Sequence, residues 1–404
     1  KKFLVFTCAT LLLIGLSVPA MAEVNIYGQI YFDTVVIDAD KENANVALSG
    51  HTSPTTFSAA TAPLAPNAAG VGGADDADLI WSDSAITRVG FNFKAGKATA
   101  GVELNNTVGK RHWWGAYDFD SFELRVGDYW SPLFFASSGA YQIVGGGIAY
   151  GGNPGGAPSS RPEQVRFRVP LPNKLGNWFL SFIENNGAAN AGILDATTGG
   201  AAFANGTNVD ITLPQIQTSL RLNFAPTSWL LYAGYQTYEE VGRQAGGSEI
   251  DFDIDAWTVG LAGSASFGPL TFKGNIWYAQ NPEDFNGSGA GTVWTARYNA
   301  VTNGIDDIDA WGFQLTGVFK FNDMVRLEVC YQGAQHEREN NGTTFGDDED
   351  DFYQFDVVLP INLVKGWVLV PTIVLADEKD QKVLGVSTDQ GKAWMYGLSW
   401  VISF

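Results

Sequence analysis

The stretch KAWMYGLSWVISF, residues 392–404, ends the chain and decides the fold. Every second residue in it is large and apolar, and most of the residues between them are small. Because a β-strand points alternate side chains to opposite faces, this strand has one large apolar face and one mostly small face. A strand that crosses an outer membrane has about 9–11 residues, with apolar side chains outward and aromatic ones at the interfaces. We therefore interpret these residues as lipid-facing: Trp394, Tyr396, Leu398, Trp400, Ile402 and Phe404.

The N-terminal segment has the three parts of a secretory signal peptide. Lys1 and Lys2 precede a short apolar run, and Ala20-Met21-Ala22 fits an A-x-A cleavage site. The run is too short for a membrane-spanning helix, and no later apolar run is long enough for one. We therefore expect residues 1–22 to be removed and residues 23–404 to form one domain.

Charge and cysteine content narrow the class of protein. The formal net charge of −19 argues against nucleic acid as a partner. An outer-membrane barrel can carry such a charge in its loops and lumen. Cys8 leaves with the signal peptide, so Cys330 remains alone and an exported chain would fold without an intramolecular disulfide.

Alternation with a period of two residues recurs along the whole chain and predicts sixteen strands. The connections between these strands alternate between short turns and longer loops, and the longest loop covers residues 34–83. An even strand number with this alternation predicts an all-β fold, a transmembrane antiparallel up-and-down β-barrel of about 16 strands. The predicted strands are 23–33, 84–95, 97–106, 110–118, 121–128, 163–170, 176–184, 212–224, 227–238, 253–265, 269–280, 308–320, 324–336, 351–361, 365–377 and 392–404.

Three stretches resemble the general diffusion porins of Gram-negative bacteria: VNIYGQIYFD (24–33), ITRVGFNFKA (86–95) and FELRVGDYWSPLF (122–134). The strand that ends in Phe404 resembles the C-terminal assembly signature of outer-membrane barrels. The resemblance implies a barrel in the bacterial cell outer membrane, commonly a homotrimer, whose third loop folds into the pore. It also implies passive diffusion of small hydrophilic solutes and ions through a water-filled channel, without a cofactor. Barrels of 16–18 strands are wide enough for such a channel.

Charged residues on the predicted lumen face are the candidates for a pore constriction. Strand parity points four arginines into the lumen, and Arg88 matches the arginine of the family's second strand. Arg111 and Arg166 fall where the family has basic residues, although Trp113 and Trp114 leave the parity of Arg111 open. Residues 131–162 contain Arg161 and no acid, so the wall arginines would outweigh the loop acids. The predicted constriction consists of Arg88, Arg111, Arg125, Arg166, Arg168, Glu103, Glu123 and Asp128.

This balance predicts a preference for anions, because a few charges in a narrow passage outweigh many screened charges in the loops. Glu103 and Glu123 oppose the prediction if they neutralise the arginines, which would then be structural ion pairs. The alternative function is a substrate-selective channel for a small carboxylate, another anion or a sugar. Aromatic residues of the third loop would line a sugar path or, the interpretation we favour, anchor the loop to the wall. These aromatic residues are Tyr129, Trp130, Phe134, Phe135 and Tyr141.

Catalysis has little support in the sequence. The chain has three histidines, His51, His112 and His336, and it has neither a G-x-S-x-G nor an H-E-x-x-H motif. Acidic runs such as residues 347–351 could bind divalent cations, but their spacing favours solvated loops. We therefore predict neither an enzyme nor a bound metal. A barrel that serves adhesion is a third hypothesis, which the lumen arginines and the glycine-rich third loop disfavour.

Overall fold

The computed structural model describes most of the predicted barrel. The predicted signal peptide, residues 1–22, lies outside the described residues. The described residues are 23–39, 78–83, 87–135, 161–184, 207–211, 213–243, 249–282, 285, 296–299, 302–339, 347–379, 381–383, 386–388 and 392–404.

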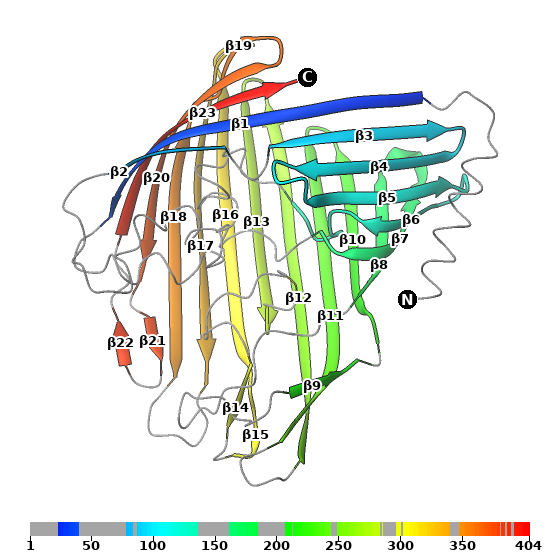
Figure 1. The fold of residues 1–404 in the computed structure, drawn as a ribbon, viewed down its shortest axis with the longest axis vertical. Coiled ribbons are helices and arrows are strands. Elements are labelled where there is room, and N and C mark those ends of the chain that lie inside the picture. Colours follow the sequence, from blue (N-terminus) through cyan, green and yellow to red (C-terminus); the bar gives the residue numbers. More distant parts are fainter. Residues whose placement is uncertain are drawn as a thin grey trace.

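The chain forms a closed, antiparallel barrel of sixteen strands (Figure 1). Neighbouring barrel strands pair antiparallel, and β23 (Lys392–Ser403) pairs with β1 (Glu23–Ala39), which closes the sheet. Closure leaves no unpaired strand edge, as the bilayer interior requires. No helix within the described ranges is long and apolar enough to cross a membrane.

Most barrel strands are continuous, but some are split. Both β2 and β3 pair with β1, and both β9 and β10 lie beside β11. The bounds are β2 (Asp78–Asp83), β3 (Arg88–Ala95), β4 (Ala98–Asn105), β5 (Lys110–Asp118), β6 (Glu123–Asp128), β7 (Glu163–Pro170), β8 (Gly176–Ile183), β9 (Thr207–Asp210), β10 (Gln215–Phe224), β11 (Thr227–Arg243), β12 (Glu249–Phe267), β13 (Leu270–Gln280), β16 (Ile308–Lys320), β17 (Arg326–Arg338), β18 (Asp348–Val358) and β20 (Trp367–Glu378).

Shorter elements complete the fold. A 3-10 turn, Pro172–Lys174, connects β7 to β8. The remaining strands are β14 (Arg297–Asn299) and β15 (Gly304–Asp306), which form a hairpin, with β19 (Ile361–Val364), β21 (Gln381–Val383) and β22 (Val386–Thr388). Short turns lie at one end of the barrel and longer loops at the other. The third loop (residues 129–162) joins β6 to β7, and the sixth loop (residues 281–307) joins β13 to β16.

The barrel wall has unequal height, as Figure 1 shows. Strand β6 has 6 residues, whereas β11 and β12 have 17 and 19. Since about 9–11 residues suffice to cross the hydrocarbon core, β11 and β12 extend past it at the loop end. The parts of β11 and β12 that extend beyond the hydrocarbon core add a stretch of inner wall against which loops can pack.

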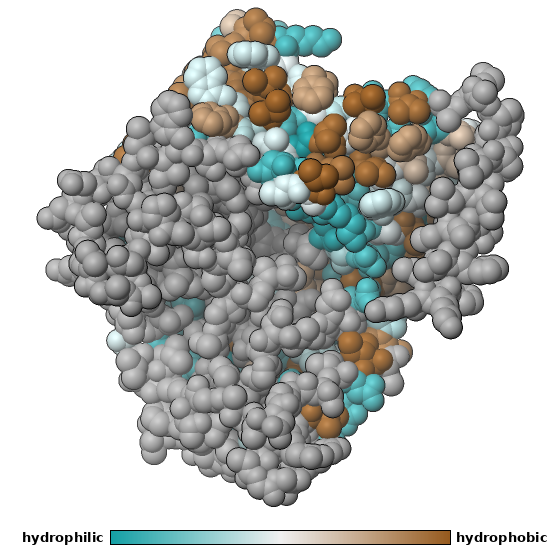
Figure 2. All heavy atoms as spheres, viewed as in Figure 1, coloured by the Kyte–Doolittle hydropathy of each residue, from teal (hydrophilic) through white to brown (hydrophobic). Residues whose placement is uncertain are grey.

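Side-chain alternation separates an apolar exterior from a polar lumen. On β10, Ile216 and Phe224 point outward and are 36% and 48% exposed, whereas Gln217 and Ser219 point inward and are buried. The same holds on β1, where Ile26 and Ile30 are exposed outside. Hydrophobic residues gather over β1 and the neighbouring strands (Figure 2). An apolar exterior on a closed barrel is the arrangement that lipid requires, so the predicted fold class is confirmed.

The last residue completes the closure of the barrel. The backbone N–H of Gly28 donates to the carbonyl oxygen of Phe404 at 3.0 Å, and the N–H of Phe404 donates back at 3.1 Å. A Cβ on Gly28 would lie 2.3 Å from the Phe404 ring, so the ring covers the glycine on the outer face. The terminal side chain therefore takes part in the final strand pairing.

We expect Phe404→Ser to lower the amount of folded barrel in the outer membrane severalfold. The variant keeps the backbone pairing but removes the apolar ring from a lipid-facing position and uncovers Gly28. The measurement is the heat-modifiable, folded fraction in purified outer membranes, with Phe404→Tyr as the control that keeps the ring. Wild-type levels of folded Phe404→Ser would contradict this role.

Several strand boundaries differ from the sequence prediction; for example, β11 continues to Arg243 rather than residue 238, and β12 begins at Glu249 rather than residue 253. Strand β1 continues to Ala39 rather than residue 33, so the first loop is shorter than expected. The turn predicted at Asn362-Leu363 lies at residues 365 and 366, where Gly366 has a φ of +84°. Pro360 cannot donate to a strand ladder, so β18 ends before it and β19 resumes the hairpin beyond it.

Candidate pore constriction

Six arginines face the lumen along β3 to β10, and we call this set the arginine wall. Register shows the shared face directly, because Arg125 lies opposite Arg166 and Glu123 lies opposite Arg168. The alternate residue Val165 points outward and is 39% exposed. The arginine wall consists of Arg88 on β3, Arg111 on β5, Arg125 on β6, Arg166 and Arg168 on β7, and Arg221 on β10.

Glu103 on β4 joins two of these arginines. Its carboxylate accepts a hydrogen bond from Arg111 Nε at 2.8 Å and lies 3.5 Å from Arg88 Nε. The Tyr27 hydroxyl donates to the same carboxylate at 2.9 Å. Glu103 is only 5% exposed, so this is a buried ion cluster in which one carboxylate meets two guanidinium groups.

Glu123 on β6 repeats the arrangement one hairpin further along. Its carboxylate lies 3.1 Å from Arg125 Nη2 and 3.3 Å from Arg168 Nη2. Among the described residues, Arg166 and Arg221 have no carboxylate within ion-pair distance. The glutamate–arginine ion pairs that would oppose an anion preference are therefore present, but the wall still carries more arginines than carboxylates.

Aromatic rings alternate with the guanidinium groups of this wall. Arg125 lies between the rings of Trp114 and Tyr129, at 4.2 and 4.1 Å from their centroids. Arg166 lies 4.8 Å from the Tyr129 ring and 5.4 Å from the Phe179 ring. Arg221 continues the stack at 5.6 Å from Phe179. Cation–π contacts hold a guanidinium group in place without cancelling its charge.

The start of the third loop folds into the barrel across the arginine wall. Gln164 Nε2 donates to the backbone carbonyl oxygens of Tyr129 and Trp130, at 2.6 and 3.3 Å. Ser131 Oγ donates to Gln217 Oε1 on β10 at 2.5 Å. Arg221 Nη2 donates to the carbonyl oxygen of Phe134 at 3.0 Å. Residues 129–135 thus pass from β6 along the inner wall as far as β10.

The predicted loop aromatics contact the wall or one another. Tyr129 belongs to the arginine stack, and the rings of Trp130 and Phe134 are stacked at 4.1 Å. Phe135 packs against a cluster of buried apolar residues on the inner wall. Tyr141 lies outside the described residues. These contacts correspond to anchoring of the loop, the interpretation favoured above.

Asp128 lies apart from the arginine wall. It is opposite Trp113, whose side chain is 59% exposed on the outer face. Its carboxylate lies 2.9 Å from Lys110 Nζ, and Lys110 also pairs with Glu163 at 2.9 Å. Strand parity already predicts this outward direction, since Asp128 is three residues beyond the inward Arg125. The structure therefore does not bring Asp128 together with the other predicted constriction residues.

Two other arginines need comment. The β4–β5 register shifts between Glu103 and Leu104, so Arg111 sits at an irregularity and reaches Glu103 despite its ambiguous parity. Arg221 was not among the predicted constriction residues, although it lies on the polar face of the predicted strand 212–224. Its contact with the Phe134 carbonyl group makes it part of the site. The sequence feature that could have identified Arg221 is its position on the lumen-facing side of β10, which lies two strands from β7.

Accessibility differs strongly within the arginine wall. The side chains of Arg168 and Arg88 are 39% and 24% exposed, and Arg221 is exposed as well. Arg166 is 6% exposed and its Nη1 donates to the carbonyl oxygen of Trp130 at 3.2 Å. Arg166 therefore supports the loop from a buried position, whereas Arg88, Arg168 and Arg221 face solvent, and Arg221 also contacts the loop.

His112 packs into the same region without an obvious catalytic partner. Its Nε2 atom lies 4.0 Å from Glu103 Oε1, and its ring is next to Tyr129 and Trp130, with centroids 5.2 and 5.6 Å away. No described contact joins it to a serine or cysteine nucleophile. The histidine therefore fills space between the ion cluster and the loop.

A closed barrel with an apolar exterior, a polar lumen and a loop folded inward has the architecture of a porin-type β-barrel. No family model matches the sequence, and no curated protein matches it. Solved structures do match the fold. The outer membrane channel DcaP of Acinetobacter baumannii is 17% identical, with a TM-score of 0.63 and coverage of 95% of this chain and 97% of the other.

Two further neighbours are outer-membrane proteins of other bacteria. The anion-selective porin of Comamonas acidovorans has 13% identity, a TM-score of 0.55 and coverage of 95% and 100%. OmpT of Vibrio cholerae has 11% identity, a TM-score of 0.53 and coverage of 95% and 98%. At these identities the likeness concerns the fold, which is that of barrels in the bacterial outer membrane.

Proposed function

We propose that the protein is a passive diffusion channel for small hydrophilic solutes that prefers anions. The observation that carries the proposal is the arginine wall beside the inward-folded third loop, in which two glutamates pair with four of the six arginines. Arg88, Arg168 and Arg221 face solvent there and would attract anions along this side of the lumen. No turnover is involved, since solutes move down their gradients.

The buried nitrogen atoms of the arginine wall support the same proposal. Arg125 Nε and Nη1, Arg166 Nε and Arg168 Nε have no hydrogen-bond partner within the described part of the chain. Positive charge that is partly removed from water acts over a short distance and is screened less by salt than charge on exposed loops. A small carboxylate or another anion fits this wall better than a neutral sugar does.

Reversal potentials in planar bilayers under a KCl gradient test the selectivity. We expect anion preference in the wild type and a clear shift toward cations in the Arg168→Ala/Arg221→Ala double variant. Both arginines face solvent. Because Arg221 also donates to the carbonyl oxygen of Phe134, the Arg168→Ala single variant is measured alongside the double variant. The control is Lys110→Ala/Lys320→Ala, which removes the same net charge outside the arginine wall and should leave the reversal potential nearly unchanged.

A cation-selective wild type, or a double variant that behaves like the wild type, would contradict the proposal. Anion preference that persists at high salt would support charges inside the passage rather than on the rim. Absence of catalysis and assembly as a homotrimer remain predictions. In support of the latter, one structure of V. cholerae OmpT is described as a trimer form.

A further inference from the structure

One sector of the inner wall is apolar, although the lumen of a water-filled barrel is normally polar. Alanines point inward there from β12, β13, β16 and β17, and we call this sector the alanine bay. Two loop residues fill it: Leu133 of the third loop is 0% exposed, and Phe285 of the sixth loop is 1% exposed. The alanines are Ala256, Ala262, Ala279, Ala310 and Ala334, with Leu230, Tyr232 and Trp277 beside them.

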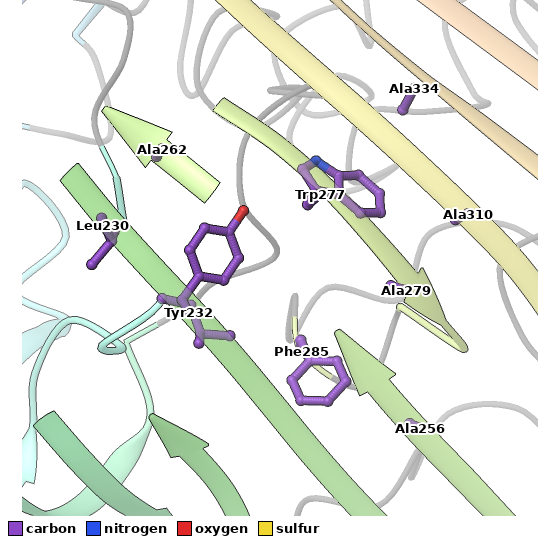
Figure 3. Packing of buried hydrophobic residues seen from close by; sticks show 10 residues of the cluster. Leu230, Tyr232, Ala256, Ala262, Trp277, Ala279, Phe285, Ala310 and Ala334 are labelled. Atoms are coloured by element: carbon purple, nitrogen blue, oxygen red, sulfur yellow. The ribbon is translucent and has the colours of Figure 1, made fainter. Parts of the chain in front are cut away.

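The bay has the shape that the Phe285 ring needs. A Cβ on Gly234 would lie 2.6 Å from that ring, so only glycine leaves room for it. In Figure 3 the ring lies between the strands that carry Tyr232 and Ala279. Small wall residues and a large loop residue thus complement each other, as in the core of a soluble protein.

The root of the sixth loop is fixed to the barrel at Asn281, four residues before Phe285. Asn281 Nδ2 donates to the carbonyl oxygen of Asp255 and to Asp307 Oδ1, each at 2.8 Å. The N–H of Ile308 donates to Asn281 Oδ1 at 3.0 Å. These bonds join the two ends of the loop to β12 and β16. Phe285 therefore projects into the bay from a fixed base.

The third loop is held at one end by the arginine wall and further along by the bay. Leu133 follows the Ser131–Gln217 hydrogen bond, and the next residue, Phe134, offers its carbonyl oxygen to Arg221. Displacement of Leu133 would carry that carbonyl group away from Arg221. Packing in the bay therefore determines the geometry of the constriction.

We infer that Phe285 is a positioning residue of the pore: it completes the alanine bay and thereby holds the third loop against the arginine wall. The inference rests on the proposed channel function. It concerns a residue that belongs to another loop and makes no described contact with the arginines. Its effect on ion passage would be exerted through Leu133.

Single-channel recording tests the inference. We expect Phe285→Ala to raise the frequency of current fluctuations about tenfold or more, because truncation of a buried phenylalanine leaves a large cavity. Leu133→Ala should do the same, and the double variant should be no worse than the more affected single variant, since both residues fill the same bay. Ion selectivity should shift along with the fluctuations, whereas the barrel should still fold and insert, although the cavity lowers its stability.

The matched control is Tyr298→Ala, which removes a buried ring from the same loop. Tyr298 is 2% exposed but belongs to a separate cluster with Tyr238, Phe252 and Ile254. It should leave fluctuations and selectivity near wild-type values. Quiet, wild-type currents in Phe285→Ala, or additive effects in the double variant, would overturn the inference. A wild type that does not conduct would instead overturn the proposed channel function.

Discussion

Glu103→Gln is expected to lower the free energy of unfolding by about 3–5 kcal/mol, the usual effect of removing one partner from a buried ion pair. Glu103 is 5% exposed and meets Arg111 at 2.8 Å and Arg88 at 3.5 Å. The substitution keeps the size of the side chain but takes away the negative charge that both arginines share. Urea-dependent unfolding in lipid vesicles measures the difference.

The control for this experiment is Glu163→Gln. Glu163 pairs with Lys110 at 2.9 Å, but the two side chains are 47% and 44% exposed. An exposed pair of this kind typically contributes about 0–1 kcal/mol, so the control should unfold almost like the wild type. Equal effects of the two substitutions would show that burial of the Glu103 cluster does not matter for stability.

The Glu103→Gln variant should also conduct with a stronger anion preference than the wild type, because the substitution adds net positive charge to the wall.

The barrel was predictable from the sequence because lipid and water impose opposite demands on alternate residues. In strands such as 212–224 and 392–404, each side chain belongs either to an apolar set or to a polar or small set. That pattern determines both the strand and its register. It weakens outside the bilayer, which explains why the extension of β1 to Ala39 was not predicted.

The candidate site was predictable only in part. Parity placed Arg88, Arg125, Arg166 and Arg168 on the lumen face, and it left pairing with Glu103 and Glu123 as an open alternative. Parity cannot show how far a side chain is covered, so the contrast between buried Arg166 and the more accessible arginines needed the structure.

Contacts between distant segments were beyond the reach of local patterns. Nothing in the sequence around Leu133 or Phe285 indicates that both enter one bay, since the two residues lie on different loops. The inward alanines, of which Ala256 and Ala310 are examples, do alternate with outward residues along their strands. A run of small inward residues on adjacent strands is therefore the signal that could have indicated a loop packed inside the barrel.

Leu398→Arg is expected to destabilise the folded barrel by about 2–4 kcal/mol, as an arginine does at the bilayer midplane on the lipid face of a barrel. Leu398 lies near the middle of β23, opposite Thr34 on β1 and Pro371 on β20. It lies on the same outer face as Tyr396 and Trp400, which are 45% and 39% exposed. An arginine there would lie opposite Thr34 and Pro371, neither of which can neutralise its charge.

The free-energy cost of an arginine on this face should depend on its depth in the bilayer. The Ile402→Arg variant tests this, because it places the same charge nearer an interface. Ile402 lies on the same face of the same strand but two residues from the end of the chain, opposite Trp367 at the turn end of β20. Near an interface the arginine can reach water, so the expected cost is about 0–1 kcal/mol. The measurement is the unfolding free energy of both variants in lipid vesicles. If both variants matched the wild type, this face of β23 would not contact lipid, and the interpretation of residues 392–404 as the lipid-facing closing strand would fail.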